Sequence, residues 1–331
     1  RYTLSLTSST AQPRAVMESL TARGWAVEDV RDWVVNGCVE PGIPGKHCSA
    51  TSSIEFNLVA VLEMALNNGK HPLMNWKLGP DTGIIGQGDF ETFDDFWKAF
   101  KEQCEFLCEQ SIIGNNQLGE IYQQHQPAPL ISSMTEGCIE SGRGVTRGGA
   151  RYNSSGVSVI GMADVVDSLM AIKTLVYDEK KITFAELKEA IDSNFAHHPR
   201  LHVMIKTRVP RFGSGNEESV TMANRVTSLV HDYFASHQNY RGGPHATGWW
   251  SMANHTVYGR VTGASPSGRL AGEPFTPGLT PHPTASPNLL DNLRDVAKLK
   301  PETLDNNIAF NVKIVPASSD SHERIIEIMA N

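Results

Sequence analysis

The stretch Asn36-Gly37-Cys38-Val39-Glu40-Pro41-Gly42-Ile43-Pro44-Gly45-Lys46 holds the residues most suggestive of chemistry, and the rest of the chain is interpreted as a scaffold around it. Its glycines, prolines and asparagine predict a loop rather than a helix or strand. A thiol and a carboxylate stand two residues apart, at Cys38 and Glu40. Side chains two apart in an extended segment point the same way, so we expect both to face one substrate cavity. The alternative is that Cys38 is a small buried hydrophobic residue and that Cys-x-Glu arose by chance.

The bulk composition is that of an ordinary globular protein. The chain has 331 residues, of which 40% are hydrophobic and 20% charged, enough for a large core or two domains. Its formal charge of -7 and pI near 6.0 argue against a nucleic-acid partner, which needs a concentrated basic face. The sequence has no run of about 18 apolar residues, so we expect no membrane-spanning helix.

The cysteines indicate a reducing environment. Five is an odd number, no paired framework is visible, and no signal peptide pattern is present, so we expect reduced thiols and a cytoplasmic location. Cys104 and Cys108 are one helical turn apart and continue an apolar stripe with Phe96 and Phe100. We therefore expect them to pack in the core, because Cys-x3-Cys without further ligands is a weak zinc signal.

The remaining elements follow from hydrophobic periodicity and from helix start and stop signals. Strands and long helices alternate, with glycine-rich turns between them and no internal repeat. This alternation predicts a single α/β domain, and it leaves a closed barrel and an open sheet as alternatives. The predicted helices cover 13–23, 54–68, 93–110, 157–177, 183–194 and 220–236, with a last one from Ser321, and the predicted strands cover 1–9, 249–260 (a strand or strand pair) and 311–315.

Six segments in order resemble the glycyl radical enzymes, and the likeness runs from about Gly37 to Asn331. They are Gly-Cys-Val-Glu-Pro at 37–41, Leu-Asn-Asn-Gly at 66–69, Leu-Gly-Pro-x-Thr-Gly at 78–83, Arg-Gly-Gly-Ala-Arg-Tyr-Asn at 147–153, Ala-Asp-Val-Val-Asp-Ser-Leu at 163–169 and Gly-Arg-x-Ala-Gly-Glu-Pro at 268–274. The resemblance implies a barrel of ten strands in two antiparallel half-barrels ringed by helices, of which residues 1–331 would be one partial domain.

Cys38 stands where the family carries its catalytic cysteine. The resemblance implies that Cys38 receives a radical stored on a glycine and, as a thiyl, takes a hydrogen atom from the substrate. A closed barrel would shield that radical from water and oxygen. Residue 39 is Val, whereas pyruvate formate-lyase has a second adjacent cysteine, which argues against formate chemistry.

The radical glycine is expected outside this stretch of sequence. Arg260-Val261-Thr262-Gly263 looks like the Arg-Val-x-Gly radical motif, but the Ser-Pro-Ser-Gly-Arg turn at 265–269 matches a segment upstream of the family's radical loop. We therefore place the glycine beyond Asn331, in a C-terminal domain, and expect the chain to be an internal fragment that is inactive alone. No cofactor is expected to bind within it.

The C-terminal part looks most similar to the alkylsuccinate synthases. The likeness rests on Phe-Thr-Pro-Gly-Leu-Thr-Pro at 275–281, Asn-Leu-Leu-Asp-Asn at 288–292 and Asn-Asn-Ile-Ala-Phe-Asn-Val-Lys at 306–313. It implies that Cys38 takes hydrogen from an alkane, that the alkyl radical adds to fumarate, and that Cys38 returns the hydrogen, as in anaerobic hydrocarbon degradation.

Glu40 supports a different reaction. Fumarate addition needs no obligatory base, whereas the family's dehydratases and arylacetate decarboxylases use a Cys-x-Glu carboxylate for proton transfer. The alternative is therefore a dehydratase, decarboxylase or C–N lyase with Glu40 as general base. Two further alternatives stay open: Glu40 only hydrogen-bonds its own loop, or the protein is a non-catalytic relative, against which the intact Cys38 argues.

Arg147, Arg151, Asn153 and His255 are further candidates for substrate binding. A dicarboxylate such as fumarate would favour a bidentate arginine. The partners that the resemblance implies are the small-molecule substrate, a radical S-adenosylmethionine activating enzyme with an iron–sulfur cluster, a second copy in a homodimer, and small accessory subunits.

Overall fold

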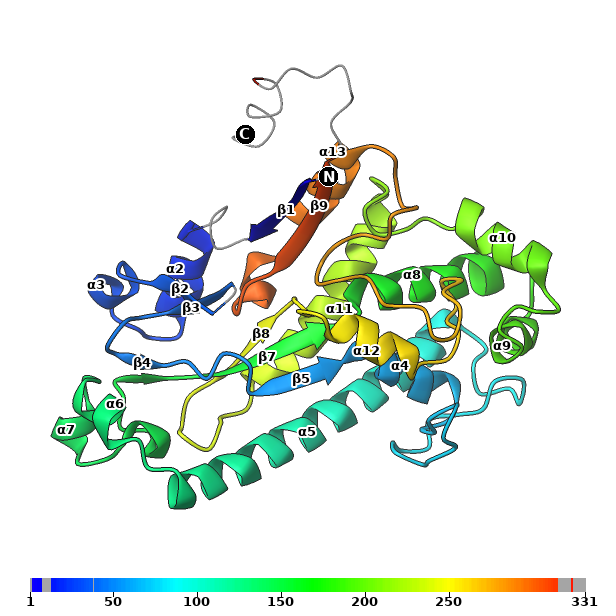
Figure 1. Ribbon diagram of the computed structural model, residues 1–331. Coiled ribbons are helices and arrows are strands. Elements are labelled where there is room, and N and C mark those ends of the chain that lie inside the picture. The colour runs from blue at the N-terminus through cyan, green and yellow to red at the C-terminus, as the bar shows by residue number, and fades with distance from the viewer. Residues whose placement is uncertain (1, 8–12, 38, 315–322, 324–331) are drawn as a thin grey trace.

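The structure is a computed structural model that describes residues 2–7, 13–37, 39–314 and 323 of the 331. A three-stranded parallel sheet lies at its centre (Figure 1), with β7 (Ser155–Ile160) between β5 (Ile54–Asn57) and β8 (His245–Gly248). Val157 pairs with Ile54 on one side and with Thr247 on the other. All of β7 is buried, as expected of a parallel strand that is covered on both faces.

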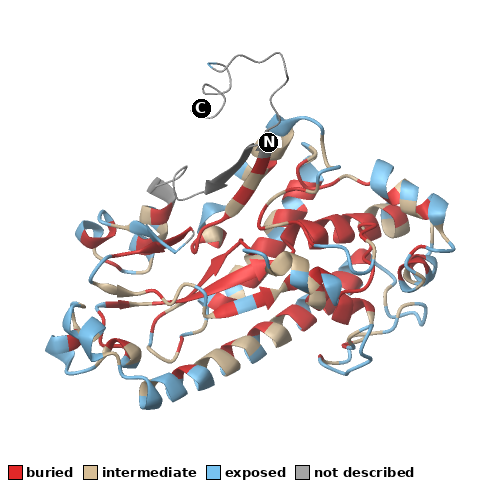
Figure 2. Cartoon of the chain, in the orientation of Figure 1, coloured by how far each residue is buried: buried red, intermediate tan, exposed pale blue. Residues whose placement is uncertain are grey.

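Long helices pack beside this sheet and form the main core with it. α4 packs against α5, and α11 packs against both α8 and α5. Their apolar sides make up the buried interior that is red in Figure 2. The bounds are α4 (Leu58–Leu66), α5 (Phe93–His125), α8 (Met162–Ile172) and α11 (Glu217–Ala235).

A smaller core lies under the first part of the chain. Trp25, Val30, Ile43 and Tyr152 belong to it. It joins segments that are far apart in sequence, because β4 (His47–Cys48) pairs in parallel with β6 (Tyr152–Asn153). The other elements around it are α2 (Pro13–Ala22), α3 (Val27–Val30), β2 (Val34–Asn36) and β3 (Glu40–Gly42).

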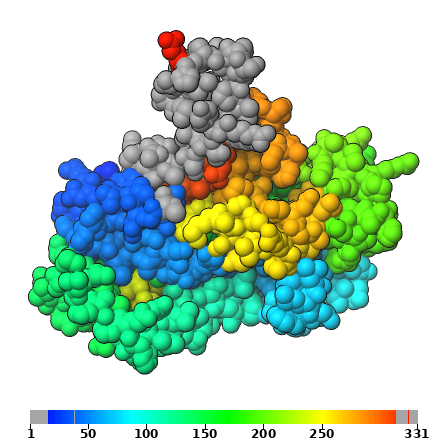
Figure 3. Space-filling view, in the orientation of Figure 1, coloured from blue at the N-terminus to red at the C-terminus, as the bar shows by residue number. Residues whose placement is uncertain are grey.

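The remaining strands bring distant segments of the chain side by side. β1 (Tyr2–Thr7) pairs antiparallel with β9 (Ala309–Ile314), with Leu4 opposite Val312 (Figure 1). In the space-filling view, the blue N-terminal segment and the green segment around α10 lie at opposite sides of the molecule (Figure 3). The other elements are α6 (Pro129–Ser133), α7 (Cys138–Ser141), η1 (Val145–Arg147), η2 (Lys173–Asp178), α9 (Phe184–Asp192), α10 (Pro199–Arg208), α12 (Asn254–Arg260), α13 (Leu289–Ala297) and η3 (Pro301–Leu304).

Several predictions from the sequence are confirmed. The first strand, the helix from Pro13 and the helix around 220–236 are present as β1, α2 and α11. Thr183 and Glu186 form the predicted capping box of α9. Thr92 and Asp95 form another at the start of α5, which continues well past the predicted end at 110 to His125.

Two predicted helices begin later than expected and one predicted strand is wrong, and each difference has a physical reason. Residues 54–68 and 157–177 are each a parallel strand followed by a helix. β7 is buried along its whole length, so its apolar residues continue the pattern of the buried helix that follows it. β5 does alternate, with Glu55 exposed, but its four residues are too few to separate it from α4 by periodicity. The predicted strand at 249–260 contains α12, and the strand lies just before it as β8. There tertiary packing overrides the β propensity of residues such as Thr256, Val257 and Tyr258.

The mixed α/β class is confirmed, and the ten-stranded barrel is not shown. Within residues 2–7, 13–37 and 39–314, the strands form one sheet of three strands and three sheets of two. The predicted helix from Ser321 falls outside the described residues apart from Glu323. In the described part of the chain, no helix has the length and apolarity needed to cross a membrane.

Candidate functional site

The predicted loop is in fact a β-hairpin. β2 and β3 pair with Asn36 opposite Glu40, so the residues between them form the turn. The expectation of a loop over 36–46 is therefore wrong for 40–42, where Glu40-Pro41-Gly42 forms an edge strand whose proline lies at a permitted position. Cys38 itself lies outside the described residues, so its orientation relative to Glu40 stays a prediction.

The Glu40 carboxylate folds back over the hairpin turn. Glu40 is 3% exposed, and its Oε2 accepts a hydrogen bond of 2.7 Å from the backbone N–H of Val39. Gly37 has φ +67°, and a Cβ built there would lie 3.2 Å from the same Oε2. The hydrogen bond to its own loop is thus present, and the carboxylate lies directly beside the backbone on either side of position 38.

Asn307 connects the turn to the opposite end of the chain. Its Nδ2 donates to the carbonyl of Val39 at 2.5 Å, and its own carbonyl accepts from the backbone N–H of Trp249 at 2.9 Å. Trp249 directly follows β8, so the turn is tied to the central sheet. No pattern in the sequence indicates this contact, because the two partners are separated by 268 residues.

Two of the candidate substrate ligands are arginines that contact other protein groups. Arg147 is exposed and donates to the carbonyl of Gln123 at 3.3 Å. Arg151 lies in an ion-pair cluster, with Nη1 at 2.5 Å from Glu136 Oε1 and Nη2 at 3.1 Å from Asp29 Oδ2. Each arginine thus has a protein partner, and a role of either one toward a substrate stays a prediction.

The other two candidates lie on different elements. Asn153 belongs to β6 and donates to the carbonyl of Ala150 at 3.0 Å, while its Oδ1 is buried without a hydrogen-bond partner. His255 lies on α12, with Nδ1 3.1 Å from Ser251 Oγ, and burial lowers its pKa. Asn153 is thus close in sequence to Arg151, whereas His255 is held separately on α12.

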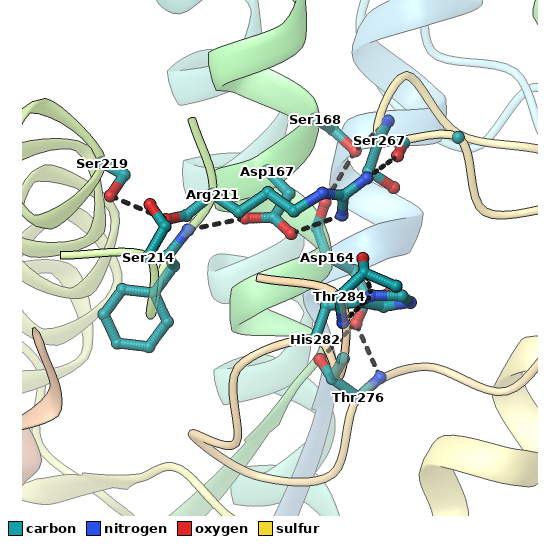
Figure 4. Close-up of polar contacts among 12 residues, drawn as sticks. Asp164, Asp167, Ser168, Arg211, Ser214, Ser219, Ser267, Thr276, His282 and Thr284 are labelled. Atoms are coloured by element: carbon teal, nitrogen blue, oxygen red, sulfur yellow. Dashed lines mark hydrogen bonds and ion pairs between the residues drawn. The ribbon is translucent and has the colours of Figure 1, made fainter. Parts of the chain in front are cut away.

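A buried polar network explains the sequence motif at 163–169 (Figure 4). Asp167 accepts from Arg211 Nη1 at 2.8 Å and from the backbone N–H of Phe212 at 2.9 Å. Burial raises the pKa of Asp167 to about 6, although Arg211 opposes this. Asp164 accepts two hydrogen bonds from Thr276, from the backbone N–H at 2.8 Å and from Oγ1 at 2.6 Å. These contacts hold the segments that contain Arg211, Phe212 and Thr276 against α8.

Gly263 is held by a second buried network. Its N–H donates to Glu63 Oε1 at 2.8 Å, and its carbonyl accepts from Arg269. Burial raises the pKa of Glu63 to about 7. The position of the radical glycine is not tested by these contacts, so its placement beyond Asn331 stays a prediction.

The cysteine pair on α5 behaves as the sequence predicts. Cys104 and Cys108 are both 0% exposed and belong to the main core. Burial raises the pKa of the Cys108 thiol well above its usual value. Among the described residues, no group of three or more His, Cys, Asp or Glu side chains is placed to hold a metal ion.

Comparison with known proteins identifies the family. The family described as pyruvate formate lyase-like matches residues 8–259. The chain therefore belongs to this family of glycyl radical enzymes, as the sequence motifs predict.

Individual relatives refine this picture. The chain is 30% identical over 267 residues to trans-4-hydroxy-L-proline dehydratase of Clostridioides difficile, covering 81% of this chain and 34% of that protein. It is 28% identical over 329 residues to indoleacetate decarboxylase of Tractidigestivibacter scatoligenes, covering 91% and 36%. The solved structure of glycerol-bound B12-independent glycerol dehydratase from Clostridium butyricum matches with a TM-score of 0.86 and 31% identity, covering 90% and 37%.

The chain spans about a third of the length of these relatives. They are dehydratases and a decarboxylase, so they favour the alternative that rests on Glu40. The predicted alkane addition to fumarate and the link to hydrocarbon degradation receive no support from these comparisons.

Proposed function

We propose that this chain is the Cys38-bearing part of a glycyl radical dehydratase or related lyase that acts on a small polar substrate. The observation that carries the proposal is the Glu40 carboxylate, which is 3% exposed and lies against the hairpin turn. A buried carboxylate two residues from the catalytic position can exchange a proton with a substrate held there. The relatives that are dehydratases and a decarboxylase support the same class of reaction.

The roles proposed for Cys38 and Glu40 account for every atom and electron when a vicinal diol loses water. The Cys38 thiyl takes a hydrogen atom from the carbon that bears one hydroxyl. Glu40 accepts the proton of that hydroxyl and returns it to the neighbouring hydroxyl, which leaves as water. The product radical takes a hydrogen atom back from the Cys38 thiol, so the net change is the loss of one water molecule.

The remaining parts of the enzyme belong to the same proposal. A radical S-adenosylmethionine activase would install the radical on a glycine beyond Asn331, and the enzyme would work as a homodimer. A buried site at the hairpin would keep the radical intermediates away from water. Arg147, Arg151, Asn153 and His255 stay candidates for binding the polar groups of the substrate.

The test uses the full-length protein, activated without oxygen and supplied with polar substrates. The panel is glycerol, 1,2-propanediol, trans-4-hydroxy-L-proline, isethionate and indoleacetate, with fumarate plus an alkane as a separate arm. We expect elimination or decarboxylation of a panel compound and no product from Cys38→Ala. Glu40→Gln should lower the turnover by about a hundredfold or more, because it removes the proton acceptor.

A matched control separates the role of Glu40 from a general loss of charge. Glu28→Gln changes an exposed glutamate on α3 and should keep the turnover of the wild type. A succinate adduct from the alkane arm without any elimination product would overturn the proposal. Full activity of Glu40→Gln would show that the carboxylate only stabilises its own turn.

A further inference from the structure

Asp29 is a buried carboxylate that connects the two ends of the hairpin. It belongs to α3, before the hairpin, and is 3% exposed. Its Oδ1 accepts a hydrogen bond from the ammonium group of Lys46, which follows the hairpin in sequence. The segment that enters the turn and the segment that leaves it are therefore held together by one ion pair.

The same carboxylate also binds the strand that supports the hairpin. Its Oδ2 accepts from the hydroxyl of Tyr152 at 2.7 Å and lies 3.1 Å from Arg151 Nη2. The Tyr152 hydroxyl accepts in turn from the backbone N–H of Ala26 at 3.1 Å, and the Tyr152 N–H donates to the carbonyl of Lys46 at 2.9 Å. Side-chain and backbone hydrogen bonds thus join α3, β6 and the segment after the hairpin.

A third segment completes the arrangement. The backbone N–H of Glu136 donates to the carbonyl of Gly45 at 2.7 Å, and its Oε1 lies 2.5 Å from Arg151 Nη1. Trp25 stacks on the ring of Tyr152 with 4.5 Å between centroids. We call Asp29, Lys46, Arg151 and Tyr152 together the hairpin clamp.

The charges of the hairpin clamp match its geometry. Hydrogen bonds from Lys46 and Tyr152 hold the pKa of Asp29 below its usual value, and the bond to Asp29 raises the pKa of Lys46. Asp29 is thus an anion that three donors share, Lys46 after the hairpin and the adjacent residues Arg151 and Tyr152. Removing the charge of Asp29 leaves Glu136, 3.8 Å from Lys46 Nζ and 2.5 Å from Arg151 Nη1, as a carboxylate paired with both cations.

We propose that Asp29 is a positioning residue that sets the place of the hairpin turn, and so of Cys38 and Glu40, relative to the substrate. This inference rests on the proposed function. Hydrogen-atom transfer depends steeply on the distance between the sulfur and the substrate carbon, and a displacement of about 1 Å can cost a hundredfold in rate. Arg151 takes part in the hairpin clamp through Asp29 and Glu136, in addition to its proposed contact with the substrate.

The experiment compares Asp29→Asn with the wild type in the full-length protein, activated without oxygen. Asn keeps the size of the side chain and removes the charge. We expect the glycyl radical content, measured by electron paramagnetic resonance, to stay within twofold, while the turnover per radical falls about tenfold or more. The isotope effect with a substrate deuterated at the reacting carbon should rise, because hydrogen transfer becomes slower.

That isotope effect distinguishes positioning from a purely structural role. If Asp29→Asn only lowered the folded fraction, the turnover per radical and the isotope effect would stay unchanged, and the proposal would be wrong. Tyr152→Phe removes one donor and keeps the aromatic ring, so it should give an intermediate loss. The control is Asp81→Asn, which removes an exposed carboxylate paired with Lys77 at 2.6 Å and should change neither quantity.

Amide hydrogen exchange of residues 34–46 provides a readout that does not depend on activity. Asp29→Asn should speed exchange there, and Asp81→Asn should not. If the wild type turns over no polar substrate, the proposed function fails, and the exchange result alone decides whether the hairpin clamp holds the turn. If the amides of Asp29→Asn exchange at the rate of the wild type, the hairpin clamp does not hold the turn. The proposal is then overturned even if the enzyme is active.

Discussion

Gly37 decides how closely the Glu40 carboxylate can approach the hairpin turn. The sequence predicted that Cys38 and Glu40 belong together, because their spacing and type are visible in the chain. It did not predict that the carboxylate turns back onto the N–H of Val39, because this depends on the left-handed backbone at Gly37 and on the pairing of β2 with β3. The residue types and their spacing are thus visible in the sequence, whereas the orientation of the Glu40 carboxylate depends on the fold.

Gly37→Ala is expected to destabilise the hairpin for two reasons. An L-residue at φ +67° costs about 1–2 kcal/mol, and the added Cβ would lie 3.2 Å from Glu40 Oε2. Denaturant unfolding of the purified protein measures the loss of free energy. Gly88→Ala is the matched control, since Gly88 has φ +88° with no heavy atom within 4 Å of the added Cβ. Equal losses in both variants would show that the Glu40 carboxylate adjusts without cost.

Glu63 is expected to make the stability depend on pH near neutrality. Its folded pKa of about 7 lies above the ordinary value of 4.5, so the folded state holds the proton more tightly than the unfolded state. The stabilisation by this group is complete below pH 4.5 and is lost as the pH rises through 7. Between pH 5.5 and pH 8 the free energy of unfolding should therefore fall by about 2 kcal/mol.

Glu63→Gln should remove most of this loss, because the amide stays neutral and can still accept from the N–H of Gly263. Urea unfolding at the two pH values gives the change for the wild type and for the variant. Glu102→Gln, at an exposed position on α5, serves as the control and should show the change of the wild type. If the free energy of unfolding changes with pH by the same amount in Glu63→Gln and in the wild type, Glu63 is not the group responsible.

At the scale of elements, the helix starts were the most predictable feature. The capping boxes at Thr92 and Thr183 depend on residues three positions apart, so the sequence shows them directly. The sequence does not reveal β7, because a parallel strand buried on both faces lacks an alternating pattern. It does not reveal β5 because four residues are too short a run to stand apart from the helix that follows. The start of α4 directly after β5 depends on a single capping residue.

Asn57 is that residue between β5 and α4. Its Oδ1 accepts from the backbone N–H groups of Val59 and Ala60, at 3.1 and 3.2 Å. Asn57→Ala should cost about 1 kcal/mol, and Asn57→Asp should cost much less because it keeps the acceptor. Thermal unfolding of both variants gives the comparison. A similar loss in both would mean that Oδ1 is not the group that starts α4.

At the scale of the whole molecule, contacts between distant segments position the hairpin. Asp29 reaches Tyr152 across 123 residues, and Asn307 reaches Val39 across 268. No periodicity or spacing in a single sequence reveals such pairs, whereas the family motifs did predict the overall class. The family was thus predictable through resemblance, whereas the contacts that support the hairpin were not.

Asn307 provides a test of this long-range support. Its backbone has φ +66°, so glycine can replace it without strain, and Asn307→Gly then removes only the side chain that donates to Val39. We expect faster amide exchange in residues 34–42 and a smaller change in β8, whose neighbour Trp249 still binds the carbonyl of residue 307. Asn75→Gly makes the same replacement at φ +53° in an exposed position and should leave the hairpin unchanged. If Asn307→Gly exchanges like the wild type, the hairpin is held by its own strands and by Asp29 alone, and the tie to the central sheet is dispensable.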